Sequence, residues 1–600
     1  MGADELEVAL SYPKLSQYLE EHPHDLKKVK DIITEIRGEY NPKVINVAAK
    51  FLDRTLLKLY NGINLDVSPS LKIDDLKEKY HVILVPNHQS HADYLALTYI
   101  LHKKLDLPVY VAGGINLNIF MVGKLFKNSG AFFIRRKFQD DNLYKVTLES
   151  YIYYLLKENR IVEFFFEGGR TRTGKLLRPR FGLFKMILEA QKELIKVKDK
   201  DLLFVPVSVA HEHIPEESSH RNESKGGKKK PESSKQLFKL FSLLNKKLGT
   251  IHIRLNKPIL VTKKEFAEKS IKDLTHQTAF DCFKKVGKYM PITPSSLLAL
   301  TMLDDAIGAL TWKQIEERCQ EVVLYALQMD IPITSSLRPE RISQSLKLAL
   351  DNFITNEKIQ VISNDKLNQV FYAINEKMRP EILYHKNMIL HHFLVPVFIN
   401  FAWFNILNGK VKTERDLIHF LNERRKQLKY EFYLPSIKEM FSQAQRIVSM
   451  SLNKEILSLT DILTFPQEDL NHLAESVKRF SSLLTFTYEA YFISAVTAKY
   501  LAQEGFTLEK YLEISRELFQ IEIEHGRVVK YQESYSTSLM KNTLSYLENK
   551  HAIDFNESTG LYTITNLPKI DELIEKFATE INDQMSINLK FGRNDSISPR

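Results

Sequence analysis

The sequence is poor in cysteine: only Cys282 and Cys319 occur in 600 residues. They form no Cys-x-x-Cys pair, so neither a disulfide framework nor a zinc site built on cysteine is predicted. Because disulfides persist mainly in oxidising compartments, this composition favours a reducing one. The first residues are acidic and lack an apolar signal core, so we expect no secretory signal.

Long apolar runs are also scarce. The longest stretch without a charged residue lies between Lys386 and Lys410 and reads NMILHHFLVPVFINFAWFNILNG. Its two histidines, proline and asparagines make it a poor membrane-spanning helix. A buried core helix or a shallow insertion into a bilayer is favoured instead, and residues 388–407, with Trp403, are one candidate for the inserted face.

The charge balance is mild. The chain has 84 Lys and Arg against 74 Asp and Glu, a net charge of +10, with 44% apolar and 26% charged residues, as in ordinary folded domains. The excess favours acidic partners such as phosphorylated substrates or anionic lipid, although a solvated basic surface fits as well. The aromatic residues fall mostly in apolar strands and helices and no nucleic-acid motif occurs, so nucleic acid is not expected as a partner.

The texture of the sequence predicts three regions. Residues 1–75 show apolar positions at helical spacing and form an N-terminal helical region. Residues 76–265 alternate short apolar runs with amphipathic helices, which predicts an α/β domain with a mostly parallel mixed sheet. Residues 266–600 predict a large, mainly helical C-terminal domain with a small hairpin around residues 556–560. A polar, lysine-rich loop is expected at residues 216–235. The expected strands begin near His81, Pro108, Ala131, Ile161, Leu202 and Ile251.

The first candidate site is Asn87-His88-Gln89-Ser90-His91-Ala92-Asp93. His88 falls at the carboxyl end of an apolar strand and Asp93 in the first turn of the next helix, where α/β proteins build sites. The pair could act as a general base and the acid that orients it. Alternatively, Ser90 and Asp93 have the spacing of a helix capping box, which would explain Asp93 without catalysis.

The second candidate is the pair Arg135-Arg136, which ends the strand that starts at Ala131. Two guanidinium groups at a strand end could bind an anion. Exposed strand-end residues without a ligand would look the same in sequence.

The third candidate is the segment FEGGRTRTGK, residues 166–175, after the strand that begins at Ile161. Its glycines allow a close approach of the backbone to a ligand. Arginines and lysines crowd here without an intervening acid, which predicts a bound phosphate or, alternatively, a solvated basic loop. The GxxxxGK spacing of a nucleotide loop is met, but Leu176 stands where that loop needs Ser or Thr, so the match is accidental. The cluster comprises Arg170, Arg172, Lys175, Arg178 and Arg180.

The fourth candidate is VPVSVAHEHIPE, residues 205–216, where an apolar strand runs into polar residues at the same sheet edge. His211 and His213 could suggest a metal, but no third ligand has convincing spacing. No metal site is predicted.

These four blocks, in this order and spacing, resemble the glycerolipid acyltransferase superfamily over residues 82–259. Further on, Thr293-Pro294-Ser295-Ser296-Leu297-Leu298-Ala299 and Tyr384-His385-Lys386-Asn387-x3-His391-x-Phe393 resemble the helical region of one branch. That branch holds bacterial-type glycerol-3-phosphate acyltransferases and relatives that act on dihydroxyacetone phosphate.

The resemblance implies roles for individual residues. His88 would be the general base and Asp93 its orienter, while the arginines of the third block would bind the glycerol phosphate. One departure is that the family usually has Tyr where this chain has His211, which puts the edge of the acyl or substrate pocket in doubt. The implied catalytic residues are His88, Asp93 and Glu167; the implied substrate-binding residues are Arg135, Arg136, Gly168, Arg170, Arg172 and Pro206.

The function implied by the resemblance is transfer of a fatty acyl group from acyl-CoA or acyl carrier protein to the sn-1 hydroxyl of glycerol 3-phosphate, giving lysophosphatidate. No cofactor and no metal are expected. Attachment to an anionic membrane surface at its cytoplasmic face, peripheral or monotopic, is expected because donor and product partition toward lipid. Two alternatives stay open: acylation of dihydroxyacetone phosphate, and a lipid- or phosphate-binding protein without catalysis.

Overall fold

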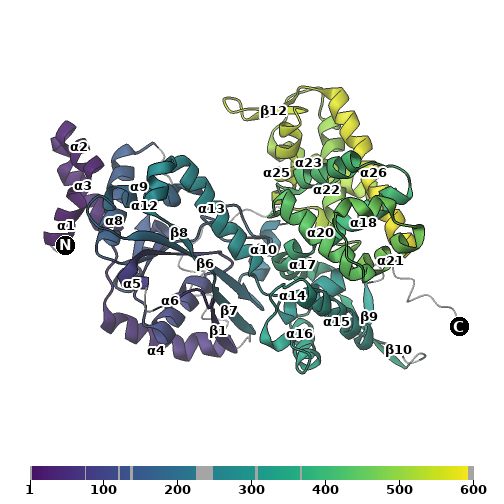
Figure 1. Cartoon of the computed structure of the whole chain (residues 1–600), viewed down its shortest axis with the longest axis horizontal. Coiled ribbons are helices and arrows are strands. Elements are labelled where there is room, and N and C mark those ends of the chain that lie inside the picture. Colours follow the sequence, from purple (N-terminus) through teal and green to yellow (C-terminus); the bar gives the residue numbers. More distant parts are fainter. Residues whose placement is uncertain are drawn as a thin grey trace. The chain divides into compact units, whose positions relative to one another are not determined.

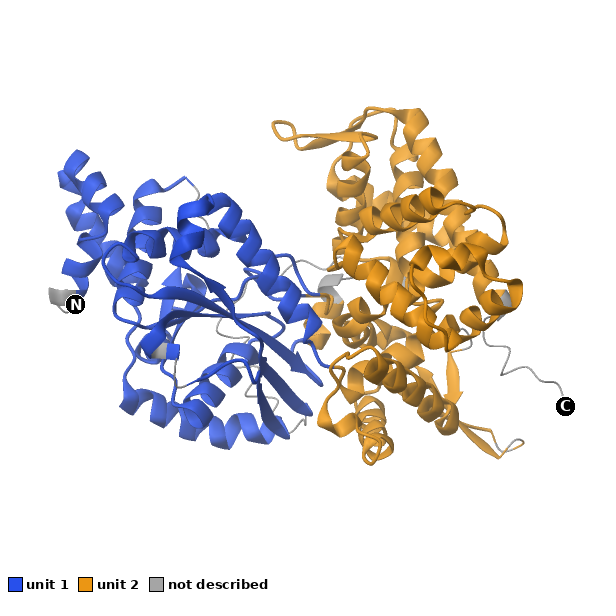
Figure 2. Cartoon of the chain, in the orientation of Figure 1, with its two compact units in different colours: residues 1–171, 176–216, 229–291 blue, residues 172–175, 217–228, 292–600 orange. Residues whose placement is uncertain are grey.

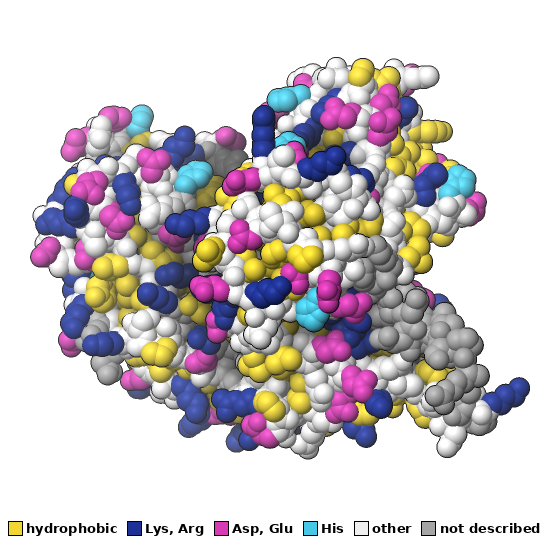
Figure 3. Space-filling view, turned by 45° about the vertical axis from the view of Figure 1, so that its right-hand side comes forward, with side chains coloured by type: hydrophobic (Ala, Val, Ile, Leu, Met, Phe, Trp, Pro, Cys, Tyr) yellow, Lys and Arg dark blue, Asp and Glu magenta, His cyan; other side chains and the backbone are white. Residues whose placement is uncertain are grey.

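The structure, a computed structural model of the chain, describes residues 3–73, 76–118, 122–135, 140–224, 248–304, 308–364, 366 and 368–591. The chain divides into two compact units (Figure 2). Unit 1 comprises Met1–Thr171, Leu176–Glu216 and Lys229–Pro291; unit 2 comprises Arg172–Lys175, Glu217–Lys228 and Ile292–Arg600. On the face drawn in Figure 3, basic and acidic side chains are interspersed, in keeping with the mild net charge of +10.

Unit 1 is built on an eight-stranded sheet in the order β1-β7-β6-β2-β5-β3-β4, with β8 also paired to β6. Neighbours from β6 to β4 are parallel, as are β1 and β7, whereas β6 is antiparallel to β7 and β8. The predicted α/β class with a mostly parallel mixed sheet is confirmed. The strands are β1 (Gly62–Val67), β2 (Tyr80–Pro86), β3 (Val109–Gly114), β4 (Ala131–Ile134), β5 (Ile161–Glu163), β6 (Asp201–His211), β7 (Thr250–Leu255) and β8 (Ile259–Val261).

Helices cover both faces of this sheet (Figure 1). α4 and α6 lie on one face and enclose a core with the inward side chains of β2, β6 and β7. α8, α9 and α13 lie on the other face (Figure 1). The central strands β2 and β6 are buried along nearly their whole length, which explains their unbroken apolar sequence. The helices of unit 1 are α1 (Ala3–Leu10), α2 (Pro13–Glu21), α3 (Leu26–Ile36), α4 (Pro42–Leu59), α5 (Leu76–Lys79), α6 (Ala92–Leu105), α7 (Val122–Asn128), α8 (Asn142–Lys157), α9 (Phe181–Leu194), α12 (Lys263–Glu268) and α13 (Ile271–Lys288).

Unit 2 is mainly helical, with α22 at its centre. Almost every residue of α22 is buried, and it packs against α23, α25 and α26. α14 is buried along its full length and begins with a capping box between Thr293 and Ser296, with Pro294 in the first turn. The helices are α10 (Glu217–Ser224), α14 (Pro294–Leu303), α15 (Trp312–Gln328), α16 (Ile342–Thr355), α17 (Arg379–Ile389), α18 (Leu394–Leu407), α19 (Glu414–Leu428), α20 (Ile437–Leu452), α21 (Gln467–Val477), α22 (Thr485–Tyr500), α23 (Leu508–Glu524), α24 (Tyr531–Ser534), α25 (Thr537–Asn549) and α26 (Leu567–Phe591).

Three local predictions are corrected. β1 lies within the N-terminal segment predicted to be helical, because its partner β7 comes far later in the chain and local periodicity cannot reveal it. A three-stranded antiparallel sheet, β9 (Ala309–Thr311), β10 (Ile359–Asn364) and β11 (Gln369–Ile374), interrupts the helical C-terminal region. α10 forms within the predicted polar loop, whose residues 225–235 lie outside the described residues.

The predicted C-terminal hairpin is confirmed. β12 (Ile553–Asn556) and β13 (Leu561–Ile564) pair antiparallel with Asn556 opposite Leu561. Gly560, in the connecting turn, has a φ of +70°, a conformation that favours glycine.

The apolar segment around residues 388–407 belongs to the core of unit 2. Among the described residues, the helical stretch Glu376–Leu407 is the one that is long and apolar enough to cross a membrane, with a mean hydropathy of 1.5. However, 83% of that apolar window is buried inside the protein. Trp403 is fully buried, and its Nε1–H donates to Asn400 Oδ1 at 3.3 Å. Of the two interpretations of this segment, the structure shows the buried core helix and not the inserted face.

Candidate active site

The first predicted block lies at the carboxyl edge of the sheet in unit 1. β2 ends at Pro86, and Asn87 ties this end to β6: its Nδ2 donates to Val209 O at 3.0 Å and its Oδ1 accepts from Val209 N at 2.8 Å. His88 follows directly, and α6 begins four residues later at Ala92. Because β2, β5 and β6 are parallel, the residues that follow each strand meet at this one edge.

His88 has the geometry of a general base. Its Nδ1 lies 2.8 Å from Asp93 Oδ2, and since a carboxylate only accepts, Nδ1 carries the proton and donates it. Nε2 therefore holds the lone pair in the neutral imidazole. The ring lies against Phe165, with 4.2 Å between ring centroids, and the side chain is 14% exposed. A hydroxyl that reaches Nε2 could be deprotonated there.

Asp93 is fully buried and accepts hydrogen bonds from four groups. Oδ2 accepts from His88 Nδ1, from Gln89 N at 2.6 Å and from Ser90 N at 2.9 Å, while Oδ1 accepts from His211 Nε2 at 2.6 Å. Burial raises the pKa of this carboxyl, but the hydrogen bonds from His211 and His88 outweigh it and hold the pKa well below its usual range. Asp93 is therefore a stable anion beside His88.

Half of the capping-box alternative for Asp93 is realised, because the Asp93 carboxylate accepts from Ser90 N as such a box requires. The N-cap position of α6 is His91, which makes no side-chain capping bond. Ser90 Oγ accepts from Ala92 N at 3.0 Å, and Asp93 N donates to the carbonyl of Ser90. The reciprocal bond from Asp93 N to Ser90 Oγ is replaced, and the Asp93 carboxylate also accepts from Gln89 N and from the two imidazoles, which a helix cap alone does not require.

His211 is a partner of the site that sequence reasoning missed. It ends β6, is fully buried, and lies 118 positions from the aspartate that it contacts. Its Nδ1 has no hydrogen-bond partner among the described residues, which fits a neutral ring with its proton on Nε2. The sequence offered one signal, a histidine where the resembling family usually has tyrosine, but nothing local pointed from His211 to Asp93.

Glu167 and the loop after β5 hold the backbone of His88. His88 N donates to Glu167 Oε2 at 3.1 Å, and Leu177 N donates to Oε1 at 3.1 Å. Thr171 N donates to the carbonyl of His88 at 2.9 Å. Burial raises the pKa of Glu167 well above its usual range, with the two backbone donors opposing this. Gly168 turns the chain with a φ of +66°. The predicted catalytic role of Glu167 stays a prediction; its contacts position His88.

Arg170 reaches the same edge through Glu216. Its side chain is 3% exposed, and Nη1 lies 3.2 Å from Glu216 Oε1. Glu216 also accepts from Ser90 Oγ at 2.8 Å and from His91 N at 3.0 Å. The guanidinium is thus fixed next to the loop that carries His88. Its predicted role in phosphate binding stays a prediction.

The other predicted residues of unit 1 lie in different settings. Arg135 donates to both carboxylate oxygens of Glu35, at 2.8 and 2.7 Å, and lies over the Tyr144 ring, so it would have to exchange partners to bind substrate. Arg136 lies outside the described residues. Pro206 sits in β6 opposite Val85 of β2, where β6 changes its antiparallel partner from β8 to β7. Lacking an N–H, it suits such a change.

Within unit 2, the end of the third block is held by α17. Asn387 Nδ2 donates to the carbonyl of Thr173 at 2.8 Å. Gly174 has a φ of +82°, and a Cβ there would lie 2.1 Å from the carbonyl oxygen of Tyr384, so glycine is required. Lys175 Nζ lies 2.6 Å from Glu431 Oε2. The motif beginning at Tyr384, for which no role was predicted, therefore determines the shape of this basic loop.

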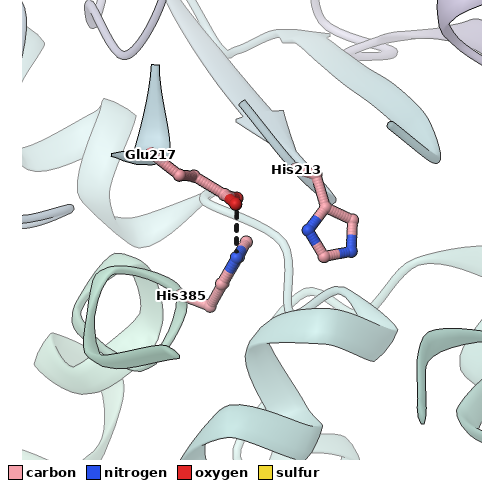
Figure 4. A group of neighbouring side chains, drawn as sticks. All are labelled: His213, Glu217 and His385. Carbon is pink, nitrogen blue, oxygen red and sulfur yellow. Dashed lines mark ion pairs between the residues drawn. The ribbon is translucent and has the colours of Figure 1, made fainter. Parts of the chain in front are cut away.

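A pocket of unit 2 opens beside this loop. Arg172 lines it, together with Arg221 of α10, Tyr384 and Asn387. Next to it, His385 Nε2 lies 2.9 Å from Glu217 Oε1 (Figure 4). Phosphate binding by Arg172 stays a prediction, and the neighbouring Arg221 gives the pocket a second guanidinium.

A second buried carboxyl, Glu163, lies at the end of β5. Neither of its oxygens has a hydrogen-bond partner among the described residues, and the side chain is fully buried. Burial, and then the nearby charge of Asp93, raise the pKa of Glu163 to about 8. The pKa values of Asp93 and Glu163 are therefore shifted in opposite directions, because Asp93 accepts four hydrogen bonds and Glu163 accepts none among the described residues.

Glu163 should make folding stability depend on pH. Its pKa in the folded state, about 8, lies above the ordinary value of 4.5, so the unfolded chain ionises first and stability falls between those pH values. Glu163→Gln cannot ionise. We expect it to raise the free energy of unfolding relative to the parent by about 1–4 kcal/mol more at pH 8 than at pH 4.5.

Denaturant unfolding at both pH values measures this difference. Glu158→Gln, an exposed carboxyl at the end of α8, is the control and should change stability equally at both. A pH-independent effect of Glu163→Gln would mean that Glu163 is ionised in the folded protein.

Comparisons with known proteins extend over both units. The family model described as glycerol-3-phosphate acyltransferase C-terminal region matches residues 221–556, and the acyltransferase model matches residues 70–210. A protein named glycerol-3-phosphate acyltransferase from Shewanella oneidensis is 28% identical over 452 residues, 73% of this chain and 54% of that protein. Proteins of the same name from Pseudoalteromonas translucida and Shewanella woodyi are 32% and 30% identical, over 61% and 62% of this chain and 46% of each relative. The chain spans about half the length of the curated relatives it matches.

Proposed function

The chain belongs to the glycerol-3-phosphate acyltransferase family, and from that premise we propose that it acylates glycerol 3-phosphate. The acyl group comes from an acyl thioester and goes to the sn-1 hydroxyl, giving lysophosphatidate for phospholipid biosynthesis. The observation that carries the proposal is the buried Asp93 carboxylate held between His88 and His211, with a lone pair at His88 Nε2.

The chemistry needs one proton carrier. His88 Nε2 takes the proton of the hydroxyl as its oxygen attacks the thioester carbonyl carbon. The tetrahedral intermediate collapses, the carbon–sulfur bond breaks, and the leaving thiolate takes the proton from His88. Asp93 stabilises the imidazolium in between, and backbone amides at the sheet edge supply hydrogen bonds to the oxyanion. The products are an ester and a free thiol.

Arg170 is proposed to bind the phosphate of the acceptor. It is buried near the His88 loop, and a guanidinium matches phosphate oxygens with two parallel hydrogen bonds. Glu216 orients it in the absence of substrate. A phosphate so placed would bring a terminal hydroxyl of the same molecule toward His88.

The donor is proposed to be acyl-CoA or acyl carrier protein, and no cofactor or metal is required. A thioester is already activated toward acyl transfer, so His88 as acid and base completes the reaction. Association with the cytoplasmic face of a membrane is part of the proposal, because a fatty acyl donor and lysophosphatidate both partition toward lipid.

Purified protein assayed with each acceptor and each donor tests the function. We expect acyl transfer to glycerol 3-phosphate, and none in His88→Ala, whose thermal transition should stay nearly unchanged because Asp93 keeps its donors from Gln89, Ser90 and His211. Faster acylation of dihydroxyacetone phosphate would shift the assignment to that ketone. Binding of the substrates without turnover would indicate a protein that holds lipid or phosphate only.

Arg170→Ala should raise the KM for glycerol 3-phosphate far more than that for the acyl donor. A charged, hydrogen-bonded contact to phosphate is worth about 2–5 kcal/mol. Arg170→Lys should restore little, since lysine lacks the planar fork. Arg180→Ala, exposed in the same basic cluster, is the matched control. Equal effects of Arg170→Ala on both KM values would indicate a structural role for the loop.

His211→Phe should lower kcat about tenfold and move the acid limb of the pH–rate profile upward. The change removes a donor from Asp93, so its negative charge stabilises the His88 imidazolium more strongly and a higher pH is needed to free the base. His211→Gln, which supplies a neutral N–H, should bring the limb back. If the acid limb of the pH–rate profile does not move in His211→Phe, His211 contributes only to packing.

A further inference from the structure

α4 in unit 1 exposes apolar side chains on its outer face. Val47 is 68% exposed, Phe51 52% and Leu57 41%. The opposite face of the same helix is buried in the core under the sheet, through Ile45, Ala49, Leu52, Leu56 and Leu59. The inner face of α4 is apolar, as expected for a helix that packs on a core. Its outer face, however, carries apolar as well as polar side chains.

The charged residues of that outer face are all basic. Lys43, Lys50, Arg54 and Lys58 are exposed. At 3.6 residues per turn, they share an arc of about 120° with the three apolar side chains. Asp53, the one acidic residue of α4, is turned away from this arc and lies 2.9 Å from Lys103.

α7, beside the start of α4, also exposes one apolar and one basic side chain. Leu125 is 43% exposed and its neighbour Lys124 is exposed. α7 is joined to the start of α4 by two backbone hydrogen bonds, from Glu39 N to Lys127 O at 2.7 Å and from Asn41 N to Asn128 O at 2.9 Å. We call these residues the basic–apolar face: Lys43, Val47, Lys50, Phe51, Arg54, Leu57, Lys58, Lys124 and Leu125.

The basic–apolar face adjoins the helix that carries Asp93. Phe126 of α7 packs edge-on against Tyr94, with 5.9 Å between ring centroids, and Tyr94 directly follows Asp93 in α6. At the other end of α6, His102 Nε2 lies 2.9 Å from Asn46 Oδ1 of α4. A partner seated on the face would therefore lie next to the elements that hold the candidate active site of unit 1.

We propose that the basic–apolar face docks unit 1 onto an anionic lipid bilayer. A helix that lies in a membrane interface buries apolar side chains among the acyl chains, while long basic side chains on its flanks reach up to the lipid phosphates. Each lysine or arginine near an anionic surface contributes about 1 kcal/mol of attraction. A single partner, the anionic bilayer, would then bind both the apolar and the basic side chains of the face.

Other occupants fit less well. A nucleic acid would match the basic residues but would not cover the exposed apolar surface of Val47, Phe51 and Leu57. A second copy of the chain would bring two sets of exposed cations together across a two-fold axis. This inference rests on the proposed function in one respect: a fatty acyl donor gives the protein a reason to bind a membrane.

Vesicle flotation tests the proposal and needs no turnover. We expect the full chain to float with phosphatidylcholine vesicles containing phosphatidylglycerol, and about tenfold less with phosphatidylcholine alone. The double variant Val47→Ser/Phe51→Ser and the triple variant Lys50→Gln/Arg54→Gln/Lys58→Gln should each lose at least tenfold in partitioning. High salt should release the first variant more completely than the parent, because screening weakens charge alone.

The chain supplies a matched control. Val197 is 67% exposed in unit 1 and lies between two lysines, so Val197→Ser removes an equally exposed valine from a basic surface elsewhere. It should float like the parent. Unchanged thermal transitions would show that each variant is folded, and unchanged turnover of a short-chain, water-soluble thioester would show an intact active site.

Several outcomes would overturn the proposal. One is flotation of both variants like the parent; another is no flotation of the parent. Duplex DNA binding lost in the same variants would assign the face to nucleic acid, and a dimer that Val47→Ser/Phe51→Ser converts to monomer would assign it to a second copy. A parent that floats but shows no acyl transfer would refute the proposed function and leave the docking face standing.

Discussion

The buried negative charge of Asp93 is the constraint on which the candidate active site depends. An ionised carboxylate without solvent is costly unless hydrogen bonds compensate for its lost hydration. Here the donors come from the loop after β2 and from the end of β6, so the charge is stable only when the two strands are in register. His88 is oriented by the same carboxylate. The sheet therefore holds the site rigidly, because a shift of β6 relative to β2 would move His211 away from Asp93.

The loop after β5 has two parts that make different contacts. Its first half, in unit 1, makes hydrogen bonds with the backbone of His88 through Glu167 and Thr171. Its last residues are shaped within unit 2 by Asn387 and by the tight contact at Gly174. Within unit 2, these contacts determine the conformation of the basic segment Arg172–Lys175. This gives a reason for the glycine at 174 that does not involve nucleotide binding.

Polar and apolar surfaces are used differently in the two units. The most apolar helical stretch, Glu376–Leu407, is largely buried in the core of unit 2, where Trp403 donates a hydrogen bond to Asn400. The exposed apolar side chains of α4 are fewer, but they are flanked by cations and none of them is needed for the core. Hydropathy alone ranks Glu376–Leu407 above α4, because it does not register which side chains the fold has already buried.

The sequence by itself determined the α/β class, most strands of the large sheet, and the positions of His88, Asp93 and Arg170 in the segments that follow strands. These follow from local patterns: apolar runs of strand length, polar residues directly after them, and chemistry-bearing residues at short spacing. It could not determine β1 or β9, whose hydrogen bonds come from partners far along the chain, and it also missed the local hairpin of β10 and β11. Nor could it pair His211 with Asp93, leave Glu163 without a partner, or expose Val47 and Phe51 while burying Trp403. Those outcomes belong to the tertiary structure, because burial, desolvation and long-range contacts exist only after distant segments have packed.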